Sequence, residues 1–273
     1  MIVFKLLRGL KTIFSSKVRK LHLTCLRLKW LSTGFCKAKI KTKSRIAHIL
    51  VTKKIEYADL ARVCVESFLS HNPEFEVIIH TDKESLQRLQ NKFRITKHLT
   101  RLRVVCDQSE SESWQEQKLN LILELSGSSD VFMDADLRWN GQLPKIDTIT
   151  FFVREFEMKE KSPFREILRT PEFNKYPDTF MKNLSFFSFS GTKSPIASSA
   201  TKALWNSYKD LCRSGIVGAD DIEKIERVSE QFIMCLVMCN NKTTVSYLKS
   251  SDSIKDGDFV ESCYYGATGG IFW

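Results

Sequence analysis

The chain has 273 residues, of which 42% are hydrophobic and 27% charged, a composition typical of a globular protein and not of a disordered one. Its formal net charge of +10 is unevenly placed, because residues 1–45 hold 13 of the 42 Lys and Arg and no Asp or Glu. The remaining residues have 29 basic side chains against 32 acidic ones, so this slightly acidic part does not suit a nucleic-acid-binding body.

Residues 1–45 predict a basic amphipathic helical extension, separate from a domain formed by residues 46–273. Apolar side chains recur at three- and four-residue spacing, at Phe4, Leu7, Leu10 and Phe14. The basic residues Lys5, Arg8 and Lys11 lie outside this apolar stripe. Such a segment suits attachment to an anionic membrane surface, but a helical hairpin packed on the domain and a transit peptide stay open.

Two absences bear on location. No uncharged stretch reaches the roughly 18 apolar residues that a membrane-spanning helix needs. The eight cysteines form no CxxC pair and no zinc spacing, which favours buried free thiols in a reducing compartment. We therefore expect a cytoplasmic protein, with peripheral attachment to the cytoplasmic face of a membrane as an option.

From residue 45 to residue 133, apolar runs typical of strands alternate with segments of helical spacing. Strands are predicted at 45–51, 75–80, 102–106 and 131–133, and helices at 57–69, 83–93 and 114–125. This alternation predicts an α/β fold with a mainly parallel sheet.

Beyond residue 136 the pattern is less regular. Strands are predicted at 148–153 and 184–190, and helices at 199–212 and 229–239. Asp220 and Asp221 are expected to lie in a loop.

The sharpest motif is the run 131–136, Val-Phe-Met-Asp-Ala-Asp, in which a buried strand leads into Asp134 and Asp136. In open α/β sheets, ligands bind beyond the carboxyl ends of the strands. Two carboxylates there can hold Mg²⁺ or Mn²⁺, and the cation can bridge a diphosphate. The structural alternative is a helix cap beside a solvated Asp.

With this motif the chain resembles glycosyltransferase family 8, the glycogenin-like retaining enzymes. The run 49–58 is similar to the family's first strand and nucleotide loop, which assigns Thr52 and Tyr57 to donor binding, with Tyr57 on the uracil. Lys118 resembles a basic residue near the sugar and diphosphate, and Glu230 and Gln231 resemble the acidic-Gln pair set against the donor sugar.

The resemblance implies a GT-A (Rossmann-like) single domain with a mainly parallel central sheet, in addition to the basic helical N-terminal extension. It implies transfer from a nucleotide-diphospho-sugar, expected to be a UDP-sugar, with Mn²⁺ or Mg²⁺ as cofactor and retention of configuration. Independently of the resemblance, the basic N-terminal segment points to an acceptor at a membrane, such as a lipid-linked saccharide or a glycan, and Asn183 and Ser185 are candidate acceptor contacts.

The C-terminal segment departs from the family's pattern. The family closes with a His that binds the metal and a Lys that holds the pyrophosphate, whereas residues 263–273 keep the Gly and final Trp and have neither. We expect the metal site to be weaker, or completed by Asp252, Asp258 or water.

Each candidate residue also has a plainer interpretation. Tyr57 could be an ordinary half-buried helix aromatic, Lys118 a solvated lysine, and Glu230 a charge favoured at a helix N-terminus.

Two other functions compete. A nucleotidyltransferase would show a Gly-rich loop after the first strand, and Thr52–Tyr57 has no Gly. A GT-A-like nucleotide-binding or scaffold protein without catalysis remains the alternative, because the third metal ligand is missing from the motif.

Overall fold

The computed structural model describes residues 45–52, 55–93, 99–108, 112–152, 154–160, 162–176, 180–193, 198–241, 243–248 and 260–262. The basic segment 1–44 and the closing segment 263–273 lie outside these ranges, so the expectations for both remain predictions. Within the described ranges, no helix combines the length and the apolar character needed to cross a membrane.

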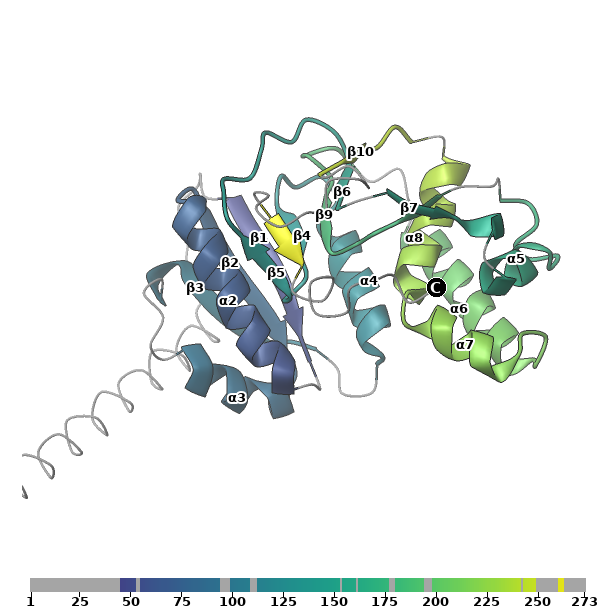
Figure 1. The fold of residues 1–273 in the computed structure, drawn as a ribbon, viewed down its shortest axis with the longest axis horizontal. Helices are drawn as coiled ribbons and strands as arrows, with labels where there is room; N and C mark the ends of the chain where they lie inside the picture. Colours follow the sequence, from purple (N-terminus) through teal and green to yellow (C-terminus); the bar gives the residue numbers. More distant parts are fainter. Residues whose placement is uncertain are drawn as a thin grey trace, which may run out of the picture.

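A seven-stranded sheet runs through the described part of the chain (Figure 1). Its order is β10 (Ser246–Tyr247), β6 (Thr150–Phe151), β9 (Phe186–Ser188), β4 (Val131–Met133), β1 (Arg45–Val51), β2 (Phe75–Thr81) and β3 (Leu102–Cys106). Strand β1 is parallel to β2 and β4, β2 to β3, and β10 to β6, whereas β9 is antiparallel to β4 and β6. The predicted α/β fold with a mainly parallel sheet is confirmed.

Helices connect the parallel strands of the first half, as crossovers between parallel strands require. They are α2 (Ile55–His71), α3 (Lys83–Phe93) and α4 (Trp114–Glu124), close to the predicted ranges. Local polar groups fix where two of them begin. Asp82 Oδ1 accepts from the Ser85 amide (2.6 Å) before α3, and Ser113 Oγ accepts from the Glu116 amide (3.2 Å) before α4.

The second half adds α5 (Ser162–Leu168), α6 (Ser198–Arg213), α7 (Ala219–Glu226) and α8 (Ser229–Asn240), with short 3-10 helices η1 (Leu99–Arg101) and η2 (Met158–Glu160). The predicted helices at 199–212 and 229–239 are confirmed as α6 and α8. The loop prediction for Asp220 and Asp221 is wrong, because both residues lie in the first turn of α7. Acidic side chains are favoured there by the helix dipole.

Two small antiparallel pairs accompany the main sheet. Strand β5 (Leu137–Trp139) pairs with β11 (Val260–Ser262), and β7 (Arg154–Glu157) pairs with β8 (Phe180–Lys182). Strand β5 follows β4 after only three residues, so it carries the chain away from the end of the central sheet.

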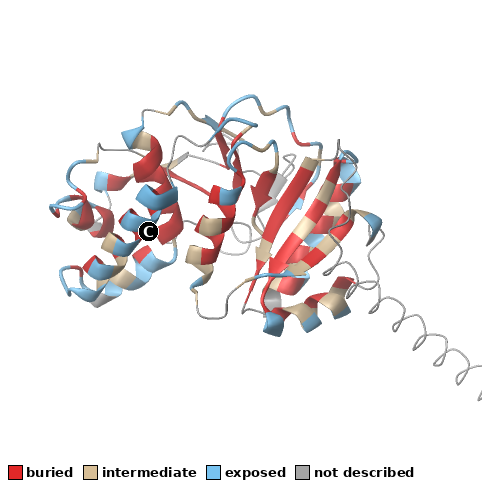
Figure 2. Cartoon of the chain, turned by 180° about the vertical axis from the view of Figure 1, so that it is seen from behind, coloured by how far each residue is buried: buried red, intermediate tan, exposed pale blue. Residues whose placement is uncertain are grey.

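Each face of the sheet has its own core, and buried residues run along both strands and helices (Figure 2). One core joins α2 and α3 to alternate residues of the strands, including Ala47, Ile49, Val77, Ile79, Val131 and Met133. The other joins α4, α6 and α8 to Phe132 and Phe187. Because strand side chains alternate between faces, Phe132 faces α4 and α8 while its neighbours face α2.

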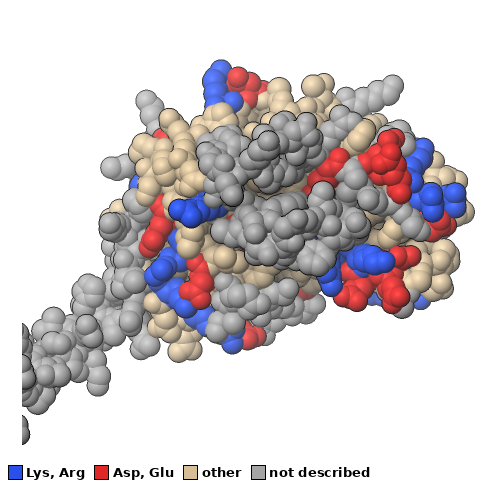
Figure 3. All heavy atoms as spheres, in the orientation of Figure 1, with Lys and Arg blue, Asp and Glu red and all other residues tan. Residues whose placement is uncertain are grey.

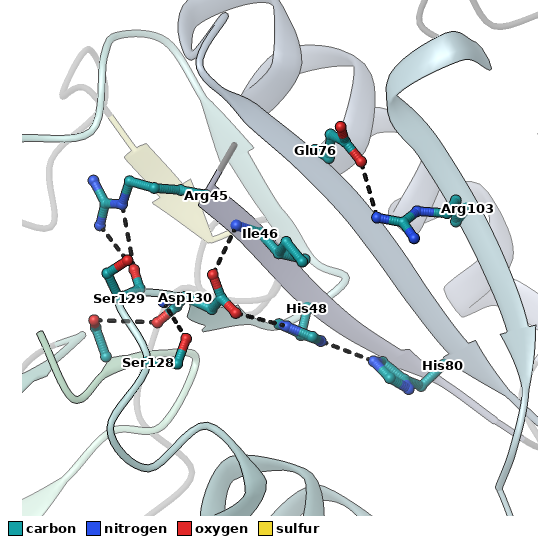
Figure 4. A network of polar contacts seen from close by, with 10 residues as sticks. Arg45, Ile46, His48, Glu76, His80, Arg103, Ser128, Ser129 and Asp130 are labelled. Carbon is teal, nitrogen blue, oxygen red and sulfur yellow. Dashed lines mark hydrogen bonds and ion pairs between the residues drawn. The ribbon is translucent and has the colours of Figure 1, made fainter. Parts of the chain in front are cut away.

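A chain of polar side chains links Asp130, just before β4, to His48 on β1 and His80 on β2 (Figure 4), and it continues to Asp107 just after β3. His48 Nδ1 lies 2.9 Å from His80 Nε2, and His80 Nδ1 lies 2.7 Å from Asp107 Oδ2. At the other end, His48 Nε2 lies 3.8 Å from Asp130 Oδ2, and Asp130 Oδ1 accepts from the Ile46 amide. Burial lowers the pKa of His48, an effect that Asp130 partly offsets.

Basic and acidic side chains are intermixed on the described part of the face in Figure 3. On α7, for example, Lys224 pairs with Asp221 (3.2 Å), and Arg227 beyond its end pairs with Glu223 (2.6 Å). Such exposed pairs contribute little to stability, so the two cores and the backbone ladders hold the fold.

Candidate active site

The paired aspartates begin directly after β4. The Asp134 amide donates to the Ser185 carbonyl (2.7 Å), which extends the contact between β4 and the chain leading into β9. The Asp134 carbonyl accepts from the Leu137 amide (3.4 Å), which closes a turn in which Ala135 is buried and Asp136 half-buried. The motif is therefore a tight turn held at the C-terminal end of β4, as the sequence predicts.

Lys118 is a buried member of this site. It lies in the middle of α4, and its Nζ is 2.8 Å from Asp134 Oδ1 and 3.1 Å from Oδ2. The side chain is 3% exposed, and its ammonium lies 5.2 Å from the centroid of Phe132 and 5.8 Å from that of Trp114. The plainer interpretation of Lys118 as a solvated lysine is wrong.

The charge of Lys118 is maintained by its neighbours. Burial alone would lower its pKa, but Asp134, Glu230 and Asp136 outweigh that effect, so the pKa lies above its usual value. The ammonium is therefore a fixed positive charge at the end of β4.

Glu230 approaches the same ammonium from α8. It lies in the first turn of that helix, is fully buried, and places Oε1 3.5 Å from Lys118 Nζ. Burial raises the pKa of Glu230 to about 7, although Lys118 opposes the rise. Glu230 does lie at the N-terminal end of α8, as the helix-terminus interpretation states. That interpretation does not explain its contact with Lys118, because a charge that only interacts with the helix dipole would remain solvated.

Gln231 follows Glu230 and is also buried. Its Oε1 has no hydrogen-bond partner among the residues that the structure describes. A buried amide oxygen without a donor costs about 1–3 kcal/mol, so a ligand hydroxyl or a water would stabilise it.

Thr52 and Tyr57 lie near the end of the neighbouring strand. Thr52 follows β1 and is buried, and Tyr57 in the first turns of α2 packs against the core beneath that helix. Strands β1 and β4 are parallel and adjacent, so Thr52 and Asp134 share the C-terminal edge of the sheet. The structure thus brings Asp134, Lys118 and Glu230 into contact and places Thr52 and Tyr57 at the same edge.

Asn183 and Ser185 support the aspartate turn from the side of β9. Asn183 Oδ1 accepts from the Ser185 amide (2.7 Å), and its Nδ2 donates to Glu155 Oε1 (2.7 Å). Both residues are buried. Glu155 could not be identified from the sequence, because nothing in residues 154–157 indicates a contact with Asn183.

Asp134 and Asp136 are the carboxylates that could hold a divalent cation. Carboxylate oxygens are the ligands that Mg²⁺ and Mn²⁺ prefer, so the donor chemistry fits. Among the described residues, no group of three or more His, Cys, Asp or Glu is arranged to hold a metal. Asp252 and Asp258, expected as possible further ligands, lie outside the described ranges.

No protein-family model and no curated protein sequence matches this chain. It is similar to the solved structure of WbbM, a bifunctional glycosyltransferase, with 12% identity, a TM-score of 0.45, and coverage of 76% of this chain and 39% of WbbM.

Two further glycosyltransferase structures are similar. For GlyE of Streptococcus pneumoniae TIGR4, the identity is 12% and the TM-score 0.38, over 76% of this chain and 45% of GlyE. For the galactosyltransferase LgtC, solved with donor and acceptor sugar analogues, the identity is 12% and the TM-score 0.41, over 60% of this chain and 65% of LgtC. The chain spans less than two thirds of the length of each of these three proteins.

Proposed function

We propose that this chain is a metal-dependent GT-A glycosyltransferase that moves a sugar from a nucleotide-diphospho-sugar, preferably a UDP-sugar, to a saccharide or lipid-linked acceptor. The observation that carries the proposal is the contact of Asp134, Lys118 and Glu230 at the C-terminal end of β4. Substrate-binding crevices of open α/β sheets occur at that edge.

The charges of this cluster suit glycosyl transfer. Departure of a nucleoside diphosphate places negative charge on the leaving group and positive charge on the sugar. A fixed ammonium at Lys118 would stabilise the diphosphate, and a carboxylate at Glu230 would stabilise the sugar. Both groups are buried, where such interactions are less screened than in water.

Asp134 and Asp136 would hold Mn²⁺ or Mg²⁺. The cation, when bound, supplies Lewis-acid stabilisation of the leaving diphosphate. Tyr57 would stack on the base of the nucleotide, and Thr52 would contact the donor at the adjoining edge. The half-buried ring and the shared edge of β1 and β4 support these two roles.

The stereochemical course depends on α8. In the retaining course that the family resemblance implies, Glu230 or Gln231 steadies the positive sugar; in an inverting course, Glu230 would act as base. NMR of the anomeric linkage in fresh product separates the two, and an inverted product would exclude retention.

The basic segment 1–45 would place the enzyme on the cytoplasmic face of an anionic membrane, near a lipid-linked acceptor. Replacing Lys5, Arg8 and Lys11 by Gln in the full chain should weaken binding to vesicles that contain anionic lipid. Unchanged vesicle binding would exclude attachment through these charges.

Calorimetric titration of UDP, with and without Mn²⁺, tests the donor site. Binding should require Mn²⁺ in the wild type and be lost in Asp134→Asn/Asp136→Asn. A matched control is Asp210→Asn/Asp221→Asn, which removes two charges from α6 and α7 and should bind as the wild type does. Equal binding by the wild type and the site variant would show that the two aspartates are not the nucleotide site.

Failure of UDP, GDP, CDP and dTDP to bind would contradict the glycosyltransferase proposal. Nucleotide binding without turnover, over a panel of donors and acceptors, would favour the alternative of an inactive GT-A-like binding or scaffold protein.

A further inference from the structure

Lys118 lies where a divalent cation would be expected to bind. Its Nζ is within 3.1 Å of both carboxylate oxygens of Asp134, the first residue of the paired-aspartate motif. An ammonium and a metal ion cannot share those oxygens without repelling each other, because both are cations.

Lys118 cannot readily withdraw from this position. It projects from the middle of α4, is buried against Phe132 and Trp114, and its Nζ also lies 3.5 Å from Glu230 Oε1. Leaving Glu230 and Asp134 would also leave a fully buried carboxylate without its counter-charge, which is costly.

The charges of the cluster favour a bound cation. Asp134 and Asp136 both act electrostatically on Lys118, and their two negative charges exceed its one positive charge. This excess of negative charge attracts a divalent cation, while the ammonium in contact with Asp134 opposes its approach.

From this arrangement we infer that Lys118 is a resident counter-cation that makes divalent-metal binding depend on the nucleotide. The inference rests on the proposed function. A cation that arrives alone must compete with Lys118 for Asp134, whereas a cation that arrives with a diphosphate brings further oxygen ligands. The diphosphate also provides negative charge that Lys118 can contact, so ammonium and metal stabilise the same ligand instead of competing.

Lys118→Met tests the inference, since Met keeps the apolar stem and removes the charge. Mn²⁺ alone is titrated into each full-length protein, and free Mn²⁺ is followed by electron paramagnetic resonance. We expect Lys118→Met to bind Mn²⁺ about tenfold or more tightly than the wild type, because one unit charge a few Å away is removed. Lys209→Met is the matched control, because Lys209 also pairs with a carboxylate, Glu116, between two helices.

The dependence on nucleotide is measured in the same way. UDP should tighten Mn²⁺ binding strongly in the wild type and much less in Lys118→Met. Asp134→Asn added to Lys118→Met should abolish the gain in affinity for Mn²⁺ alone. Mn²⁺ binding by Lys118→Met that is no tighter than in the wild type, or a gain that survives Asp134→Asn, would overturn the inference.

A second pair of variants guards against misfolding of Lys118→Met, which leaves Glu230 unpaired. Lys118→Met/Glu230→Gln compared with Glu230→Gln should show the same increase in Mn²⁺ affinity, and its absence would contradict the inference. Failure of UDP to bind in any condition would count against the proposed function alone, since the comparison with Mn²⁺ alone needs no nucleotide.

Discussion

Glu230→Gln should change how the stability of this protein depends on pH. The buried carboxyl of Glu230 has a pKa of about 7 in the folded chain, against an ordinary value of 4.5. Between these values the folded protein holds a proton that the unfolded chain has released. The contribution to stability is therefore fully present below pH 4.5 and is lost as the pH rises through 7.

The size of the effect follows from that window. Each pH unit within it lowers the free energy of unfolding by about 1.4 kcal/mol, so the full window corresponds to about 3 kcal/mol. Gln does not titrate, and it retains a polar group of the same shape. Lys118 keeps Asp134 as a partner at 2.8 Å, so the remaining ammonium stays paired.

Urea denaturation at several pH values from 5 to 9 measures the difference. The free energy of unfolding of the wild type should fall relative to that of Glu230→Gln by about 2.5 kcal/mol across the series, and the variant should be the more stable at pH 8. Glu223→Gln, which removes an exposed carboxylate from α7, controls for the change in net charge. Parallel curves for the wild type and Glu230→Gln would refute the reasoning.

Three further predictions concern other parts of the fold. Tyr57→Ala should weaken UDP binding by about tenfold and Tyr57→Phe should not, as measured by calorimetry, because stacking needs only the ring; equal losses would exclude stacking. His48→Gln should reduce the loss of stability that denaturation curves show below pH 6.5. Burial lowers the pKa of His48, so below that pH the unfolded chain binds a proton that the folded protein does not. A loss of stability below pH 6.5 equal to that of the wild type would contradict this. Asn72→Ala should lower the free energy of unfolding by about 1–3 kcal/mol, because the buried Asn72 Oδ1 accepts from the Leu143 amide (2.7 Å); a Tm within error of the wild type would show that the amide finds another partner.

The alternation of strands and helices up to β4 could be predicted from the sequence because each element there is long enough to show its own period. Strand β1 is seven residues long and helix α2 seventeen, and both match their predicted positions closely. The short pair β7 and β8 and the helix α5 could not be predicted. Each has seven residues or fewer, and their positions depend on packing with distant parts of the chain.

The aspartate motif could be recognised because its position after a buried strand is local information. The burial of Lys118 could not be derived in this way. Its position on α4 suits a solvated lysine equally well, and the contact with Glu230 requires α8, more than a hundred residues later in the chain. Segments 1–44 and 263–273 lie outside the described residues, so the expectations for them remain predictions.

The antiparallel strand β9 has a consequence for the order in which the protein can mature. It pairs with β4 along Val131–Met133, and the Ser185 carbonyl accepts a hydrogen bond from the Asp134 amide. The aspartate motif is therefore completed only by residues that lie some fifty positions later in the chain. While the chain is being synthesised on the ribosome, β4 can pair with β1, but its other edge has no partner until β9 is made, and its three residues are apolar. Such an edge can pair with another nascent chain. A stall in synthesis or a cleavage between β4 and β9 would therefore yield a fragment that is prone to aggregate through this strand edge.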